Sequence, residues 1–274
     1  MIRRSTSHGY LLITQNDHAN LAAEIATHWG NTSFPAPQPQ RSVVDAIEYH
    51  DAGWSLHDSE PALNAERRPA TFYETPAEYY GRVWVASIAA AAARAGAMGG
   101  LIVSWHFSAL ARSSYERGQL SELAREILER FACTQRVRQA EYCQALRLTP
   151  ALANGQRTAM NGRDRQALYN LDVLRVCDWL SLLLCADNLP ESLAQRRIDL
   201  RSRPDAWVTA NWIDQATLSI SPWPLDTTRL PLSIPARRLG RRRYRRNEDL
   251  QREFEHARVE TLGFALVASD NAHA

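Results

Sequence analysis

Hydrophobic residues recur at helical spacing through the first two-thirds of the chain. Apolar positions three and four residues apart, bounded by glycine or proline, indicate amphipathic helices. The pattern predicts helices at about residues 16–29, 42–53, 77–96, 99–112, 119–148 and 165–186. The last of these segments is rich in leucine on all sides, which is typical of a helix buried inside a protein core.

Beyond about residue 205 the spacing of apolar residues changes from helical to alternating. Alternation is typical of strands that bury one face. It predicts a short helix at 247–258 and strands at about 10–13, 206–213, 217–223, 230–235 and 259–268. The predicted fold is therefore mainly α: a multi-helix bundle over residues 1–204, and a small α+β unit over 205–274 packed on it. The sheet of that unit can be joined by the N-terminal strand.

Composition narrows the function classes. The chain has 45% hydrophobic and 23% charged residues, as in an ordered globular protein, and a net charge of +2. It contains no lysine, which excludes Schiff-base and Walker-type lysine chemistry. The basic run Arg237–Arg246 can hold phosphates, but we favour a solvated turn because acidic residues follow at once. A nucleic-acid partner is not expected.

The expected location is the cytoplasm. The N-terminal apolar run is too short for a signal peptide, and no continuous apolar stretch approaches the length of a membrane span, so no membrane association is expected. The cysteines form no CxxC pair and show no zinc-finger spacing. We interpret them as buried, reduced thiols. A homo-oligomer is compatible with the sequence.

Ionisable residues occur on the apolar faces of four predicted helices. Burial of such a group without a partner costs several kcal/mol. The residues concerned are His18, His50, Asp51, His106 and Asp178. A divalent transition metal in the bundle interior explains all of them together, because imidazole and carboxylate suit manganese, iron, nickel or zinc. Adjacent residues differ by about 100° around a helix, so His50 and Asp51 can share a metal only beside the helix flank.

The order of these residues resembles a known superfamily. A histidine, a His-Asp doublet and a final aspartate in a helical domain are similar to the HD-type metal-dependent phosphohydrolases. The resemblance implies an HD-like helical domain in which His18, His50, Asp51 and Asp178 bind one metal and His106 is an intervening histidine. More narrowly, LLITQNDHA, EYHDAGW and DWLSLLLC resemble a bacterial family known only as a domain of unknown function.

The chain departs from the superfamily pattern in one respect. Binuclear members present two intervening histidines, whereas the only candidate here besides His106 is His57, in a loop after the doublet. We therefore expect one metal. Residues that flank the ligands can support them or line a pocket, although for each alone we favour a solvated edge or, for the tryptophans, core packing. They are Gln15, Glu48, Trp54, His57, Asp58 and Trp105.

These features predict a metal-dependent hydrolase that acts on a small phosphate ester or nucleotide through a metal-activated water. The catalytic residues would be Asp51 and His106, with His106 contacting the phosphate or moving a proton. Two alternatives stay open. An HD-like di-iron oxygenase would need more ligands than the sequence offers, and a non-catalytic metal-stabilised binding protein would close the metal site with protein ligands alone.

Overall fold

The structure is a computed structural model that describes residues 1–116, 118, 120–154, 160–191, 194, 197–203 and 205–269. The helices in this part of the chain are α1 (Gln15–Thr27), α2 (Gln40–Glu48), α3 (Ser55–Ser59), α4 (Tyr80–Glu116), α5 (Glu122–Ala145), α6 (Gly162–Cys185) and α7 (Asn247–Glu255). The strands are β1 (Ile2–Ser5), β2 (Tyr10–Ile13), β3 (Arg197–Asp199), β4 (Trp207–Trp212), β5 (Thr217–Ser221), β6 (Arg229–Leu239) and β7 (Val259–Ala268).

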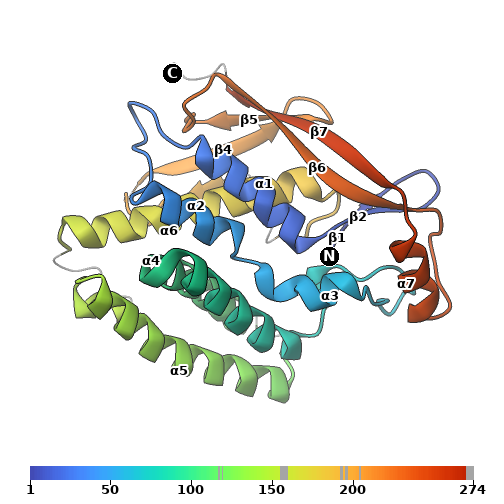
Figure 1. Ribbon diagram of the computed structural model, residues 1–274, viewed down its shortest axis with the longest axis horizontal. Coiled ribbons are helices and arrows are strands. Elements are labelled where there is room, and N and C mark those ends of the chain that lie inside the picture. The colour runs from blue at the N-terminus through green and yellow to red at the C-terminus, as the bar shows by residue number, and fades with distance from the viewer. Residues whose placement is uncertain are drawn as a thin grey trace.

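The strands form one seven-stranded sheet in the order β1-β2-β6-β7-β5-β4-β3. Only the β5–β7 pair is parallel among these neighbours. The sheet curls into a half-barrel, and the part of the chain that the structure describes is 52% helix and 19% strand. The prediction of a mainly helical bundle with a small sheet unit is therefore wrong. Figure 1 shows the sheet extending across one whole side of the helices.

Three features of the sequence concealed the size of this sheet. Strand β1 has two arginines in four residues, and β3 is only three residues long, so neither gives a clear alternating signal. Strand β6 contains Pro231 and Pro235, which usually end a strand. Both prolines nevertheless lie on its exposed face, and β6 continues to Leu239 with alternating burial. The strand thus runs into the arginine-rich segment.

Helix α1 lies between the sheet and the other helices. It contacts β6 on one side and α2 and α6 on the other, as Figure 1 shows. The main hydrophobic core contains side chains from these helices and from the sheet, including the fully buried Ile25, Leu174 and Leu218. The predicted division of the chain into two units, residues 1–204 and 205–274, stays a prediction. The main hydrophobic core contains residues from both of these ranges.

Helix α4 joins the two helices predicted at 77–96 and 99–112. Gly96 has a positive φ of 67° and interrupts the helix, so the element is kinked. By length and composition this helix could cross a membrane. A buried core helix meets the same test, and Ile102 and Phe107 of α4 are buried in the core. The cytoplasmic location stays a prediction.

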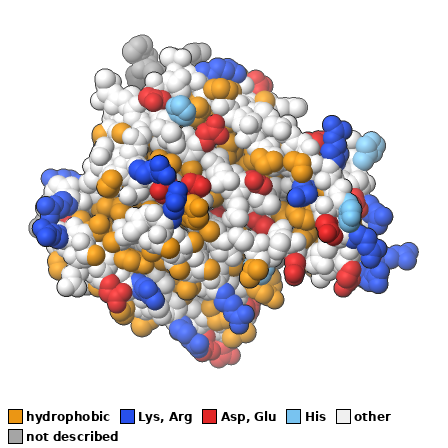
Figure 2. All heavy atoms as spheres, viewed as in Figure 1, with side chains coloured by type: hydrophobic (Ala, Val, Ile, Leu, Met, Phe, Trp, Pro, Cys, Tyr) orange, Lys and Arg blue, Asp and Glu red, His pale blue; other side chains and the backbone are white. Residues whose placement is uncertain are grey.

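Arginines of the Arg237–Arg246 run are largely engaged with the C-terminal segments. Arg238 pairs with Glu260 at 2.6 Å, Arg241 with Glu253 at 3.3 Å, and Arg246 with Asp249 at 3.2 Å. Figure 2 shows basic side chains gathered at the end of the molecule where Figure 1 places α7. The run therefore holds α7 against the sheet, which leaves less charge for an anionic partner.

All four cysteines are free, and Cys133 is exposed whereas the other three are buried.

Candidate metal centre

The His-Asp doublet lies on a turn and not on a helix. The helix predicted at 42–53 ends at Glu48, and Asp51 immediately precedes a 3-10 turn formed by residues Ala52–Trp54. The expected separation of about 100° between His50 and Asp51 therefore does not apply. Because the backbone turns here, the two adjacent side chains can point to the same place.

Gly53 fixes this turn against α4. Its backbone N–H donates to Ser87 Oγ at 3.0 Å. A Cβ atom at this position would lie 2.1 Å from the carbonyl oxygen of Val83, far inside van der Waals contact. The glycine of the EYHDAGW segment is thus required by the close approach of two backbones.

The structure brings together the four residues predicted as ligands, and each is buried or largely so. His18 Nε2 lies 3.0 Å from Asp178 Oδ1 and 3.7 Å from Asp51 Oδ2. His50 Nε2 lies 3.3 Å from Asp178 Oδ1 and 3.5 Å from Asp51 Oδ2. Ligand atoms of His18, His50 and Asp51 all fall within 4.8 Å of one another.

The hydrogen bonds of His50 define which ring nitrogen carries its proton. Nδ1 lies 2.6 Å from the carbonyl oxygen of Ile47, which can only accept, so Nδ1–H is the donor. In the neutral ring, Nε2 then has a lone pair. This buried Nε2 makes no hydrogen bond to any described group, and it faces the two carboxylates.

Ser181 defines the proton of His18 in the same way. The hydroxyl of Ser181 donates its single proton to the carbonyl oxygen of Asp178 at 2.9 Å. It must therefore accept from His18 Nδ1, which lies 2.8 Å away. The lone pair of a neutral His18 is thus on Nε2, directed at Asp178.

This arrangement fits a metal ion. Two imidazole lone pairs and two carboxylates converge, and lone pairs that face each other at these distances repel unless a cation lies between them. Ligand atoms about 2.1 Å from one ion lie about 3.0 Å apart at a right angle and about 3.4 Å apart at the tetrahedral angle. The observed distances between the histidine and carboxylate atoms, 3.0 to 3.7 Å, agree with this spacing.

The charges of these groups are strongly coupled. Burial lowers the pKa of His50, but the Asp51 and Asp178 carboxylates outweigh it and raise that pKa to about 9. Burial raises the pKa of Asp51. Burial also acts to raise the pKa of Asp178, yet the neighbouring His18 and His50 imidazoles hold that pKa well below the usual range. The pocket therefore favours a bound positive charge, whether a proton or a metal ion.

His106 stands beside the cluster, on α4. Its Nε2 lies 3.5 Å from the second oxygen of Asp178, Oδ2, and its ring centroid is 5.9 Å from that of His50. Burial lowers the pKa of His106 to about 4, and the positive charges of Arg175 and Arg201 contribute in the same direction. His106 is thus neutral at neutral pH. One carboxylate oxygen of Asp178, Oδ2, faces His106, and the other, Oδ1, faces His18 and His50.

The flanking residues differ in their surroundings. Trp54 packs in an aromatic cluster with His57, Phe72 and Tyr80, so both Trp54 and His57 are explained by packing. Asp58 is buried and accepts a hydrogen bond from the backbone N–H of Gln15 at 2.5 Å. The side chain of Gln15 is also buried. Glu48 is partly exposed at the end of α2. Trp105 lines a cavity next to His106.

Several residues that shape the site were not found from the sequence. Ser181 follows Asp178 by one helical turn in DWLS, and this i, i+3 spacing is the signal that could have identified it. The contribution of the Ile47 carbonyl could not be found, because a backbone acceptor has no sequence signature. Arg175 and Arg201 carry no signal that separates them from the many other arginines.

The comparisons with known proteins define the family of this chain. Residues 1–241 match the model of a family described as Protein of unknown function, DUF3891, and the chain therefore belongs to that family. The matched region includes every residue of the cluster. No curated protein and no solved structure matches the chain. The resemblance to the HD superfamily stays a prediction that depends on the four ligand positions and their order.

Proposed function

We propose that this protein is a metal-dependent hydrolase of small phosphate esters, with one divalent transition metal held by His18, His50, Asp51 and Asp178. The observation that carries the proposal is the direction of the two imidazole lone pairs, which face two carboxylates inside a buried pocket. Manganese, iron, nickel and zinc all suit this donor set. Such a metal, when bound, lowers the pKa of a water molecule and polarises a phosphoryl oxygen.

The remaining residues have defined tasks in this proposal. His106 is neutral at neutral pH and can therefore accept a proton or donate a hydrogen bond to a phosphate oxygen. Asp51, whose pKa burial raises, is the carboxylate better suited to accept a proton. Arg175 and Arg201 place positive charge near His106, where a substrate phosphate would be stabilised.

Metal content tests the site directly. Protein purified without a metal-affinity tag should contain about one transition metal ion per chain by mass spectrometry. His50→Ala and Asp178→Ala should both lose it. The matched control is His28→Ala, because His28 also pairs with a carboxylate, Asp226, but at an exposed position. A wild type that carries no metal and takes up none of manganese, iron, nickel or zinc would overturn the proposal.

Activity requires a separate test. Metal-loaded protein should hydrolyse p-nitrophenyl phosphate or its diester, bis-p-nitrophenyl phosphate. His106→Gln should keep the metal and lose activity by about 100-fold, because it removes a positioned proton carrier and not a ligand. If His106→Gln is fully active, the role given to His106 is wrong. If the loaded wild type cleaves neither ester, a phosphohydrolase assignment fails while the metal site stands.

A further inference from the structure

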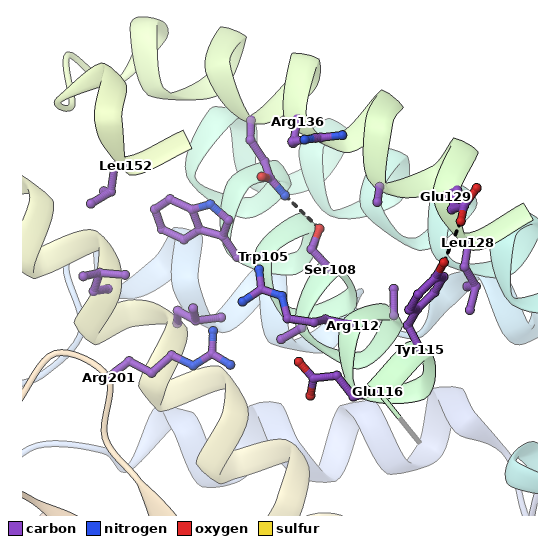
Figure 3. A pocket seen from close by; sticks show the side chains of 16 residues that line it. Trp105, Ser108, Arg112, Tyr115, Glu116, Leu128, Glu129, Arg136, Leu152 and Arg201 are labelled. Atoms are coloured by element: carbon purple, nitrogen blue, oxygen red, sulfur yellow. Dashed lines mark hydrogen bonds between the residues drawn. The ribbon is translucent and has the colours of Figure 1, made fainter. Parts of the chain in front are cut away.

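A cavity of about 510 Å³ lies between α4, α5 and α6, and one of its lining residues, Trp105, immediately precedes His106. Figure 3 shows the side chains that surround it. This volume is within the usual range for small-molecule sites. The described residues that line it, and that carry the argument, are Trp105, Arg112, Glu116, Arg136, Leu171 and Arg201.

The cavity combines apolar walls with guanidinium groups. Trp105 and Leu171 are buried and present apolar surface, whereas Arg112 and Arg136 are exposed and make no ion pair with any described carboxylate. Figure 3 shows the side chains of Arg112 and Arg201 directed toward the same part of the cavity. Exposed arginines such as Arg112 and Arg136, which make no ion pair with a described carboxylate, favour a ligand with an anionic group at the mouth of an apolar cavity.

The other polar groups of the described wall are largely engaged with one another. Gln139 Nε2 donates to Ser104 Oγ at 2.8 Å and to Ser108 Oγ at 2.9 Å, so its amide protons are already used. Ser108 Oγ accepts from Gln139, and its own proton is free to bind a ligand. Glu129 accepts a hydrogen bond from Tyr115 at 2.7 Å. Glu116 and Glu129 are the carboxylates of the described wall, and the Tyr115 hydroxyl occupies one oxygen of Glu129.

The cavity adjoins the metal centre through three residues. Trp105 immediately precedes His106 in α4. Leu171 lies seven residues before Asp178 in α6, which is about two turns and places both on one face of the helix. Arg201 lines the cavity, and its positive charge also acts on His106. The cavity therefore lies on the same helices as His106 and Asp178, although neither of these residues lines it.

Arg201 is held in place by a buried carboxylate. Asp172 of α6 accepts the backbone N–H of Arg201 at 2.8 Å and that of Ser202 at 2.7 Å. It also pairs with Arg175 at 3.2 Å. Asp172 is fully buried, so these bonds satisfy a charge that would otherwise be costly. It is a positioning residue for Arg201.

We propose that this cavity binds a flat apolar group that carries an anionic substituent, with the apolar group packed on Trp105 and Leu171 and the anion held between Arg112 and Arg201. That this ligand is the non-reacting part of the substrate rests on the proposed function. The binding itself does not, because none of these residues is a proposed metal ligand.

Calorimetric titration with naphthalenesulfonate tests the binding, and naphthalenemethanol is its neutral counterpart. Neither probe has a bond that the proposed hydrolase would cleave. The full-length wild type should bind the sulfonate about tenfold more tightly than the alcohol. Trp105→Phe should lose the quenching of tryptophan fluorescence that accompanies binding. Equal affinity for the two probes, or no saturable binding at millimolar concentrations, would overturn the proposal.

Charge variants locate the anion. Arg112→Gln and Arg201→Gln should each weaken sulfonate binding about fivefold without changing the affinity for the alcohol, and Glu116→Gln should strengthen it about twofold. Arg138→Gln on α5 is the matched control, since Arg138 is exposed and does not line the cavity. If Arg112→Gln behaves like Arg138→Gln, the anion is not held there. Sulfonate binding should be unchanged in His50→Ala, so that failure of the metal site and failure of the cavity give different results.

Discussion

The Nε2 atom of His18 lies 3.0 Å from Oδ1 of Asp178, although Ser181 directs the proton of a neutral His18 to the opposite side of the ring. Two acceptors at this distance need a cation between them. Ser181 is therefore as much a part of the site as the proposed ligands are, because it determines which nitrogen of His18 faces the carboxylates.

We predict that Ser181→Ala weakens metal affinity about 10-fold to 100-fold, because His18 loses the acceptor that orients its ring. Competition with a chromogenic chelator measures this change. Ser59→Ala is the matched control: Ser59 donates the same kind of hydroxyl bond to a carbonyl three residues earlier, that of Leu56 at 2.8 Å, but its hydroxyl bonds to no described histidine. Equal affinities of the two variants would show that Ser181 only caps the backbone.

Gly53→Ala should displace the turn that carries the doublet. The new Cβ would meet the Val83 carbonyl at 2.1 Å, so the 3-10 turn must move away from α4. We expect a loss of about 2 kcal/mol in unfolding free energy and loss of the bound metal. Urea denaturation and metal analysis measure the two effects. Gly162→Ala has no atom within 4 Å of the new Cβ and should be neutral or slightly stabilising.

Asp164 should make stability depend on pH at the start of α6. Its carboxylate accepts from the Thr149 amide at 2.9 Å, the Thr149 hydroxyl at 2.6 Å and the Asn161 amide at 3.0 Å. Burial opposes ionisation, but these bonds prevail and lower the pKa of Asp164 in the folded state. Its contribution is therefore present above the pKa of the unfolded chain and is lost as pH falls through the folded value.

Asp164→Ala should accordingly cost about 2 kcal/mol at neutral pH, and the difference from wild type should shrink in acid. Urea denaturation at a series of pH values gives both quantities. Glu122→Gln, which also alters an acidic residue in the first turn of a helix, is the control and should have a small effect. A deficit for Asp164→Ala that is independent of pH would mean that packing, and not charge, is responsible.

Asp172→Asn tests whether this carboxylate positions Arg201. The amide can accept only one of the two backbone bonds, so the segment after β3 should loosen and the preference for sulfonate over alcohol should fall as it does in Arg201→Gln. In a double-mutant cycle, Asp172→Asn should add little to the Arg201→Gln variant. Additive losses would indicate that Asp172 acts on binding by another route.

The cluster could be predicted from the sequence because each of its members is an ionisable residue that interrupts an apolar pattern. His18 and Asp178 follow helical spacing in regular helices, so their neighbours in sequence predicted their burial. The turn at His50 could not be predicted in this way. Val43 and Ile47 continue the helical pattern up to the doublet, and the helix end at Glu48 depends on the contact of Gly53 with α4. A contact between distant segments leaves no periodic signal.

The sheet was underestimated for a related reason. Alternation identified β4, β5 and β7, but β6 joins strands from the two ends of the chain, and this pairing is a property of tertiary structure. Strand β1 pairs with β2 through Ile2 and Ile13, while its remaining residues are polar. Local patterns therefore showed that strands exist and could not show that they form one curved sheet around α1.

In the proposed enzyme, helix α6 would fix the distance between the two parts of the site that hold the substrate. It carries Asp172, which anchors Arg201, and Asp178 of the metal centre, and both side chains belong to one continuous buried helix. Six residues separate them, which corresponds to about 9 Å along the helix axis. Because a helix does not stretch, the span between the anion-binding end of the cavity and the reacting centre is fixed by the backbone. The proposed enzyme would then select its substrates by length as well as by charge.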